Sequence, residues 1–214
     1  MGFDLHGLKP IINKKESKKM KKLMKRWGDK NGWYLDWKKD IPEKVKSKYF
    51  KLKDKHHYNN PGIYFRSNVW WWRPIWQYVS LFCDDFLSVK DIAAGHSNDG
   101  ETICKTKALK IASRFNRTDR DGTMDAWVKI HKDEYKKGKK HNDKIQKELR
   151  KITKECIKAV KDDNIVPADF PEPFKTRWQN KYNEKDWNGN YPTSKEALLE
   201  FSQFCKESGG FDIL

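Results

Sequence analysis

The sequence predicts an α+β fold that is rich in helix, with a small sheet packed on several helices. Short apolar–polar alternation at residues 1–10 and an apolar run at residues 211–214 are typical of strands. Long stretches between them carry apolar residues at helical spacing. Ten Trp among 214 residues supply large rings for a core, although only 36% of the residues are hydrophobic. We therefore expect one core domain, a basic N-terminal insertion and a long charged helical arm.

The core domain is expected to comprise residues 1–10 and 62–214, interrupted by the insertion at residues 11–61. Residues 1–10, MGFDLHGLKP, predict a strand. In the insertion, NKKESKKMKKLMKRW predicts a basic helix, because its apolar residues recur at positions i, i+3, i+4 and i+7. The later stretch SKYFKLKDKHHYNNPG predicts loops or a loosely packed hairpin.

The positive charge is concentrated in the insertion. Residues 11–60 hold 17 Lys and Arg against six Asp and Glu, whereas the rest of the chain holds 29 against 24. Such a segment indicates a polyanionic partner. A compositional lysine bias that merely solvates the segment explains the same count.

The stretch GIYFRSNVWWWRPIW, residues 62–76, places three consecutive Trp beside two Arg. Proline is tolerated in the first turn of a helix, so Pro74 predicts a helix from about residue 72 to Cys83, preceded by extended chain. Trp72 and Trp76 then share the buried face. Trp70 and Trp71 cannot both join them, because neighbouring residues point in different directions.

The remaining elements follow in order. Ser97 or Asn98 is expected to cap a helix, and residues 119–163 predict a long charged helix with a narrow apolar stripe. Residues 166–173 form a proline-stiffened connector, and RWQNKYNEKDWNGNY predicts a turn-rich strand or hairpin. A last helix begins near Thr193 or Ser194 and ends at the Gly209–Gly210 pair, and residues 211–214 predict an edge strand.

Cysteine spacing and hydropathy indicate the cellular compartment of the protein. The four Cys are at least 21 residues apart, so no CxxC pair is available for zinc or thiol exchange. Three of them fall at apolar helix positions, which predicts buried free thiols in a reducing compartment. No signal-peptide pattern and no apolar run of 18 residues is present, so we expect a cytosolic protein without membrane contact.

Four motifs together resemble a family of small proteins encoded by bacteriophages: MGFDLHG, GIYFRSNVWWWRPIWQYV, GHSNDGE and LLEFSQFCKESGGFDIL. The resemblance covers residues 1–10, 62–116 and 191–214, and the basic segment has no counterpart in it. Members of this family generally carry no assigned activity. The resemblance implies an accessory protein in the cytoplasm of an infected bacterial host.

The best candidate site from the sequence is the Arg66–Asn68–Trp70–Trp71–Arg73 cluster, with Tyr64 beside it. Guanidinium groups offer forked donors to phosphate oxygens, and aromatic faces stack on nucleobases. In this interpretation Asn68 orients the base. In the alternative, the arginines stack on the indoles and only keep the surface soluble.

A second candidate is the turn GHSNDGE, which places His96 and Asn98 before a predicted helix start. A helix N-terminus binds anions through its free N–H groups. Convergence of His96, Asp99 and Glu101 on a metal ion is a further alternative, although little else completes such a shell. Helix capping explains these residue types best.

Three functions compete. The first is a binder that sequesters a phosphate-containing nucleotide signal of the host's immune system, without chemistry and as a homo-oligomer. The second is nucleic-acid binding through residues 11–60 and the exposed Trp. The third is a protein inhibitor of a host enzyme. Because no nucleophile elbow, P-loop, GxGxxG motif or carboxylate dyad is present, we expect no enzyme, no cofactor and no metal site.

Overall fold

The computed structural model describes residues 2–30, 34–97 and 100–214. The chain divides into two compact units, the first comprising Met1–Asp121 and Glu196–Leu214 and the second Gly122–Lys195. Each unit is described by itself below. The expected separation of a family core from an insertion at residues 11–61 stays a prediction, because compactness does not test it.

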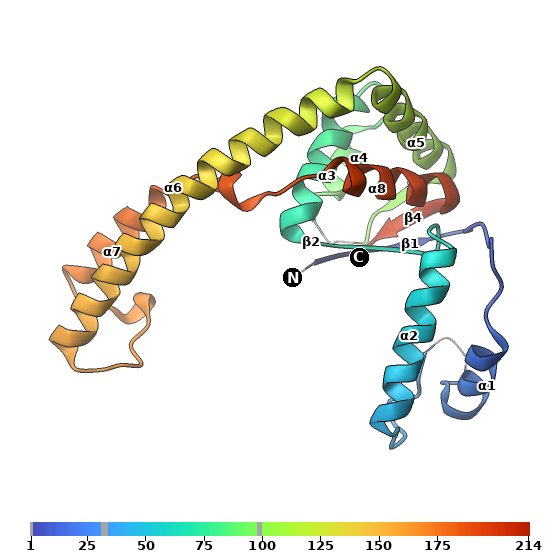
Figure 1. Cartoon of the computed structure of the whole chain (residues 1–214), viewed down its shortest axis with the longest axis horizontal. Coiled ribbons are helices and arrows are strands. Elements are labelled where there is room, and N and C mark those ends of the chain that lie inside the picture. The colour runs from blue at the N-terminus through green and yellow to red at the C-terminus, as the bar shows by residue number, and fades with distance from the viewer. Residues whose placement is uncertain (1, 31–33, 98–99) are drawn as a thin grey trace. The chain divides into compact units, whose positions relative to one another are not determined.

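The first unit contains a four-stranded antiparallel sheet in the order β2-β1-β4-β3 (Figure 1). The strands are β1 (Gly2–Gly7), β2 (Tyr64–Asn68), β3 (Thr102–Cys104) and β4 (Gly210–Ile213). Together with the helices they confirm the helix-rich α+β fold. The expectation of an edge strand at residues 211–214 was wrong, because β4 pairs with both β1 and β3. Phe211 and Ile213 are fully buried, and an interior strand hides such apolar residues better than an edge.

One face of the sheet carries the core. Phe3 and Leu5 of β1 are buried, while Asp4 and His6 between them point to the other face, as the alternation of a strand requires. The helices α3 (Val69–Phe82), α5 (Lys105–Arg120) and α8 (Lys195–Glu207) lie on the buried side, and the short α4 (Val89–Ala94) follows α3 (Figure 1). Their fully buried rings include those of Trp72, Trp76, Tyr78, Phe115, Phe201 and Phe204.

Helix α3 begins at Val69, three residues before the predicted start. The Asn68 side-chain oxygen accepts hydrogen bonds from the backbone N–H groups of Trp70 and Trp71, which fixes the start. Pro74 therefore lies in the second turn and not in the first as predicted, and it has no backbone N–H to donate to the carbonyl of Trp70. The Trp72 ring stacks on Trp76 at 5.2 Å, so the prediction that these two rings belong to the core is confirmed.

Residues 11–61 fold around a small hydrophobic cluster of their own. Helix α1 (Lys18–Trp27) packs beside α2 (Glu43–Asn59), and the buried members of the cluster are Met20, Leu23, Leu35, Ile41 and Tyr49 (Figure 1). The basic helix predicted in this segment is confirmed as α1. The expectation of loops or a hairpin over the stretch that forms α2 was wrong. Val45, Tyr49 and Leu52 pack at helical spacing against α1, a pattern that the surrounding lysines obscure.

The second unit is built on the 38-residue helix α6 (Thr123–Val160). Helix α7 (Phe174–Asn183) and the 3₁₀ turn η2 (Trp187–Asn190) pack against it, and a 3₁₀ turn η1 (Pro167–Asp169) precedes α7. The long charged helix is confirmed. The expected strand or hairpin at residues 177–191 was wrong, because Trp178 and Tyr182 stack at 5.0 Å, one helical turn apart.

All four cysteines are free, and Cys83, Cys156 and Cys205 are buried, as predicted. Burial raises the pKa of the Cys83 thiol to about 12, which keeps it protonated and unreactive. Cys104 is exposed at the end of β3. Within residues 2–30, 34–97 and 100–214, no helix combines the length and the apolar character that a membrane span requires.

Candidate ligand-binding site

The face of the sheet that the core helices leave uncovered carries a row of polar side chains. Asp4 and His6 of β1 lie on this open face, and the register pairs them with Arg66 and Tyr64 of β2. The Tyr64 hydroxyl donates a hydrogen bond to Asp4 Oδ1, and Arg66 Nε lies 3.6 Å from the same oxygen. Burial and the bond to Asp4 raise the pKa of Tyr64 to about 12, so its hydroxyl stays protonated.

A cavity of about 480 Å³ lies on this open face, between the strands and the two helices of residues 11–61. This volume is within the range of small-molecule sites in proteins. Besides Met20 and Ile63, it is lined by three tyrosines, three histidines, one lysine and one glutamate: Tyr34, Tyr49, Tyr64, His6, His56, His57, Lys53 and Glu16. We call it the open-face cavity.

The Tyr64 ring contacts two imidazoles. The centroids of His6 and His57 each lie 5.1 Å from that of Tyr64, at interplanar angles of 58° and 42°. Burial, followed by the positive charge of Lys53, lowers the pKa of His57 to about 4. His57 is therefore neutral at physiological pH and can donate or accept one hydrogen bond at each ring nitrogen according to its tautomer.

Lys53 supplies a cation to the cavity. Its Nζ lies 5.0 Å from the ring centroid of Tyr34 and 5.8 Å from that of Tyr49. These cation–π contacts keep the ammonium group against the aromatic wall, where it can meet a phosphate oxygen. Glu16 has only acceptor oxygens when ionised, so it suits a hydroxyl or amino group of a ligand and repels its phosphate. The cavity therefore offers both a cation and an acceptor group.

Asn60 connects two segments that border the cavity through hydrogen bonds of its side chain. Its side chain is fully buried and its Oδ1 accepts a hydrogen bond of 2.8 Å from Lys14 N. Its Nδ2 lies 3.0 Å from Lys14 O, 2.8 Å from His56 O and 3.1 Å from His56 Nδ1. The amide thereby joins the chain before α1 to the end of α2. This link fixes the position of the histidine pair.

The cluster predicted from the sequence is divided between two places. Tyr64 lines the open-face cavity, and Arg66 lies beside it on the same face of the sheet. Asn68 caps α3, so its oxygen is engaged by the backbone. Trp70 and Trp71 lie in the first turn of α3 with 44% and 37% of their surfaces exposed, beyond the cavity lining. Ligand contact by the Trp pair stays a prediction.

Arg73 and His96 contact each other at the N-terminal part of α3. The guanidinium can only donate, so Arg73 Nη1 donates to His96 Nδ1 at 3.1 Å. Burial and the charge of Arg73 lower the pKa of His96. His96 follows the end of α4 and does not begin a helix, because β3 comes between it and α5. Asn98 and Asp99 lie outside the described residues.

The sequence interpretation assigned no role to His56 and His57 and passed over Tyr34 and Lys53. The available signal was the histidine pair, which stands seven residues before Tyr64 at the end of an aromatic, lysine-rich stretch. The site could be recognised only from the contact between that stretch and the first strand. No local sequence pattern predicts this long-range contact.

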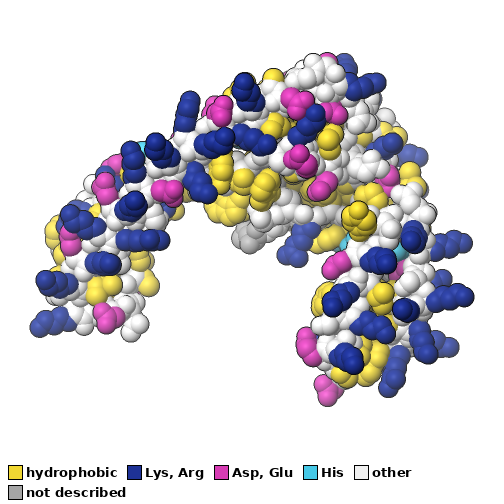
Figure 2. All heavy atoms as spheres, in the orientation of Figure 1, with side chains coloured by type: hydrophobic (Ala, Val, Ile, Leu, Met, Phe, Trp, Pro, Cys, Tyr) yellow, Lys and Arg dark blue, Asp and Glu magenta, His cyan; other side chains and the backbone are white. Residues whose placement is uncertain are grey.

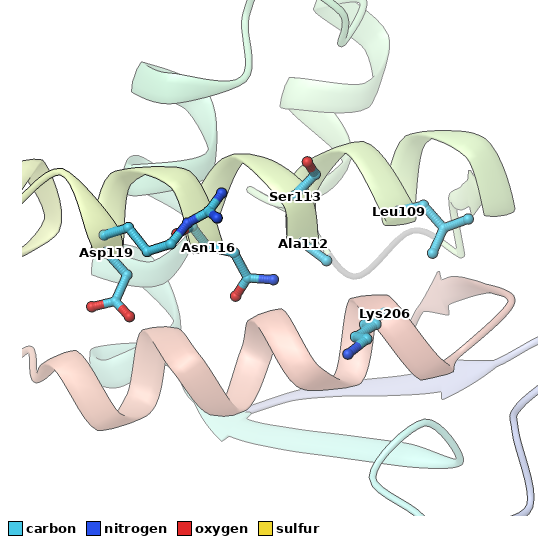
Figure 3. A pocket seen from close by; sticks show the side chains of 7 residues that line it. Leu109, Ala112, Ser113, Asn116, Asp119 and Lys206 are labelled. Atoms are coloured by element: carbon cyan, nitrogen blue, oxygen red, sulfur yellow. The ribbon is translucent and has the colours of Figure 1, made fainter.

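A second hollow, of about 530 Å³, lies between α5 and α8 (Figure 3). Asn116, Asp119 and Arg120 border it from α5 and Lys206 from α8. It offers positively and negatively charged side chains that can form hydrogen bonds, but its lining contains no aromatic ring. It therefore fits a nucleobase less well than the open-face cavity.

Within the described part of the chain, no group of three His, Cys, Asp or Glu side chains is placed to hold a metal ion. Comparisons with protein-family models, curated proteins and solved structures found no match to the chain.

Proposed function

We propose that the chain binds a small phosphate-containing nucleotide in the open-face cavity and holds it without chemical change. The observation that supports the proposal is the lining itself. Tyr34 and Tyr64 offer aromatic faces for a base, and Lys53 offers a cation for a phosphate within the same 480 Å³. Glu16 can accept hydrogen bonds from a sugar hydroxyl or a base amino group.

Sequestration of a nucleotide signal in an infected bacterium agrees with the resemblance to phage proteins. A binder that acts by removing a ligand needs a cavity and affinity, and it needs no catalytic group. We further propose that it does so in the cytoplasm, as a homo-oligomer. Nucleic-acid binding by residues 11–60 and the exposed Trp, and inhibition of a host enzyme, are the alternatives.

The test begins with small molecules released by heat from protein purified out of cells and identified by mass spectrometry. Purified protein is then titrated calorimetrically with cyclic dinucleotides, cyclic ADP-ribose isomers and mononucleotides. Tyr34→Ala is expected to weaken binding about 5- to 150-fold, since loss of one base–aromatic contact costs about 1–3 kcal/mol. Lys53→Gln is also expected to weaken binding, because it removes the cation offered to the phosphate. Trp37→Ala, which removes an exposed ring stacked on Phe50 away from the cavity, is the matched control and should bind normally.

Two results would count against the proposal. If none of the nucleotides binds at micromolar protein, the cavity has another role. If Trp71→Ala abolishes binding while Tyr34→Ala does not, the ligand lies at the start of α3, as the sequence interpretation placed it.

A further inference from the structure

Helix α6 of the second unit presents a row of cations that the proposed function does not use. Five side chains form it: Lys147, Arg150, Lys151, Lys154 and Lys158. We call it the basic face. The spacing of i, i+3, i+4, i+7 and i+11 places all five on one side of a helix. At about 1.5 Å per residue, the row is about 16 Å long.

This row lies opposite the buried side of α6. Ile145, Leu149, Ile152 and Cys156 are buried, and the five cations are exposed. The helix is therefore anchored by its apolar side while the basic face is directed to solvent. Figure 2 shows dark-blue side chains along this helix.

The two acidic residues of the same segment pair with cations of α7, and one of them, Glu155, also borders the basic face. Glu148 Oε2 lies 3.1 Å from Lys181, and Glu155 Oε2 lies 3.0 Å from Arg177, both partners being on α7. Among the described residues, none of the five cations of the basic face forms an ion pair. Since Glu155 is engaged by Arg177, the five positive charges stand together without an ion-pair partner, and a polyanion would relieve their mutual repulsion.

We propose that the basic face binds the phosphate backbone of double-stranded nucleic acid, without sequence preference. A duplex carries one charge per about 1.7 Å of axis, so a row of about 16 Å can meet five phosphates. The basic face contains no aromatic ring for stacking on single-stranded bases and no apolar side chain for insertion into a membrane. Lysine contacts phosphate as a point charge and carries little base specificity.

The test measures fluorescence anisotropy of a labelled 20-base-pair duplex with the full chain, from 50 to 200 mM salt. The variant Lys147→Gln/Lys151→Gln/Lys154→Gln removes three charges from the basic face. Since each phosphate contact contributes about 0.9 to the slope of log K against log salt, the slope should fall by about 2–3. Affinity at 50 mM salt should fall at least tenfold.

The matched control is Lys105→Gln/Lys175→Gln/Lys206→Gln, which removes three exposed charges from other elements. It should bind the duplex like the unmodified chain, and circular dichroism should show equal helix content in both variants. Equal losses in the two triple variants would overturn the proposal, because net charge alone would then explain binding. Unchanged binding by the basic-face variant, or binding only to single strands or phosphatidylserine vesicles, would overturn it too. Tyr34→Ala should leave duplex binding unaffected, which separates this proposal from the nucleotide proposal.

Discussion

The imidazole of His57 lies 5.1 Å from the ring of Tyr64, centroid to centroid, where α2 meets the open face of the sheet. This contact places a histidine from residues 11–61 against a strand of the first unit's sheet. Burial at the contact, with Lys53 close by, holds the pKa of His57 near 4. An unfolded chain would have a histidine pKa of about 6.5.

The first prediction concerns pH. Between pH 6.5 and 4 the unfolded chain takes up a proton at His57 that the folded chain does not, so stability is complete above pH 6.5 and falls as the pH is lowered. His57→Gln should reduce the loss of urea resistance between pH 7.5 and pH 5. The urea midpoint of the first unit measures it, and His141→Gln in the second unit serves as the control. Equal losses in the unmodified protein and His57→Gln would contradict the assignment.

The second prediction concerns Asn60. Asn60→Ala removes the acceptor for Lys14 N and the donor to His56 O, both in a buried position. Leaving buried polar groups unpaired costs about 1–3 kcal/mol. Hydrogen exchange should therefore accelerate in residues 11–30 and 43–60, and nucleotide binding should weaken. Asn59→Ala, a change to the neighbouring side chain that bonds only within α2, should have a much smaller effect. Unaltered exchange in Asn60→Ala would show that the amide does not join these segments.

The third prediction separates neighbouring tryptophans. Trp72 is fully buried and its Nε1 donates to Gly95 O at 2.6 Å, so Trp72→Ala should destabilise the first unit by about 3–5 kcal/mol. Trp71→Ala should cost about 1 kcal/mol or less, because the Trp71 ring is partly solvated. Chemical denaturation compares the two. Similar losses would show that Trp71 also supports the core.

The fourth prediction concerns a close approach of α6 and η2 at Gly138 and Gly189. A Cβ on Gly138 would lie 2.5 Å from the backbone nitrogen of Gly189, which no side-chain rotation relieves. Alanine gains about 1 kcal/mol of helix propensity, but forcing η2 away should cost more, for a net loss of about 1–2 kcal/mol. Hydrogen exchange at residues 186–190 should rise in Gly138→Ala. It should not rise in Lys140→Ala, which changes an exposed position two residues later.

The fold class and most long helices could be predicted because they depend on local patterns. The apolar stripe of α6 and the buried spacing of Trp72 and Trp76 are visible in the sequence itself. Helix α2 was missed because six of its 17 residues are lysines and only Val45, Tyr49 and Leu52 mark its packed side. The interior place of β4 was missed because strand order is decided by pairing across more than 100 residues, which no local pattern reports.

The candidate site was predicted only in part for the same reason. Tyr64 and Arg66 were singled out from their surroundings in the sequence, and both lie on the open face. The partners that make a cavity around Tyr64 come from β1, α2 and the residues near α1. Their chemistry is ordinary when each is considered alone. Only the packing of residues 11–61 on the strands brings the rings, the ammonium group and the carboxylate together.

The interior position of β4 has a consequence for synthesis on the ribosome. Strands β1 and β2 can pair as soon as residue 68 has emerged, but β3 gains its neighbour only when residues 210–213 have left the exit tunnel. Until then the apolar side of the nascent sheet is incomplete, and Phe211 and Ile213 cannot yet cover it. The sheet of the first unit therefore cannot be completed before residues 210–213 are free to pair with both β1 and β3.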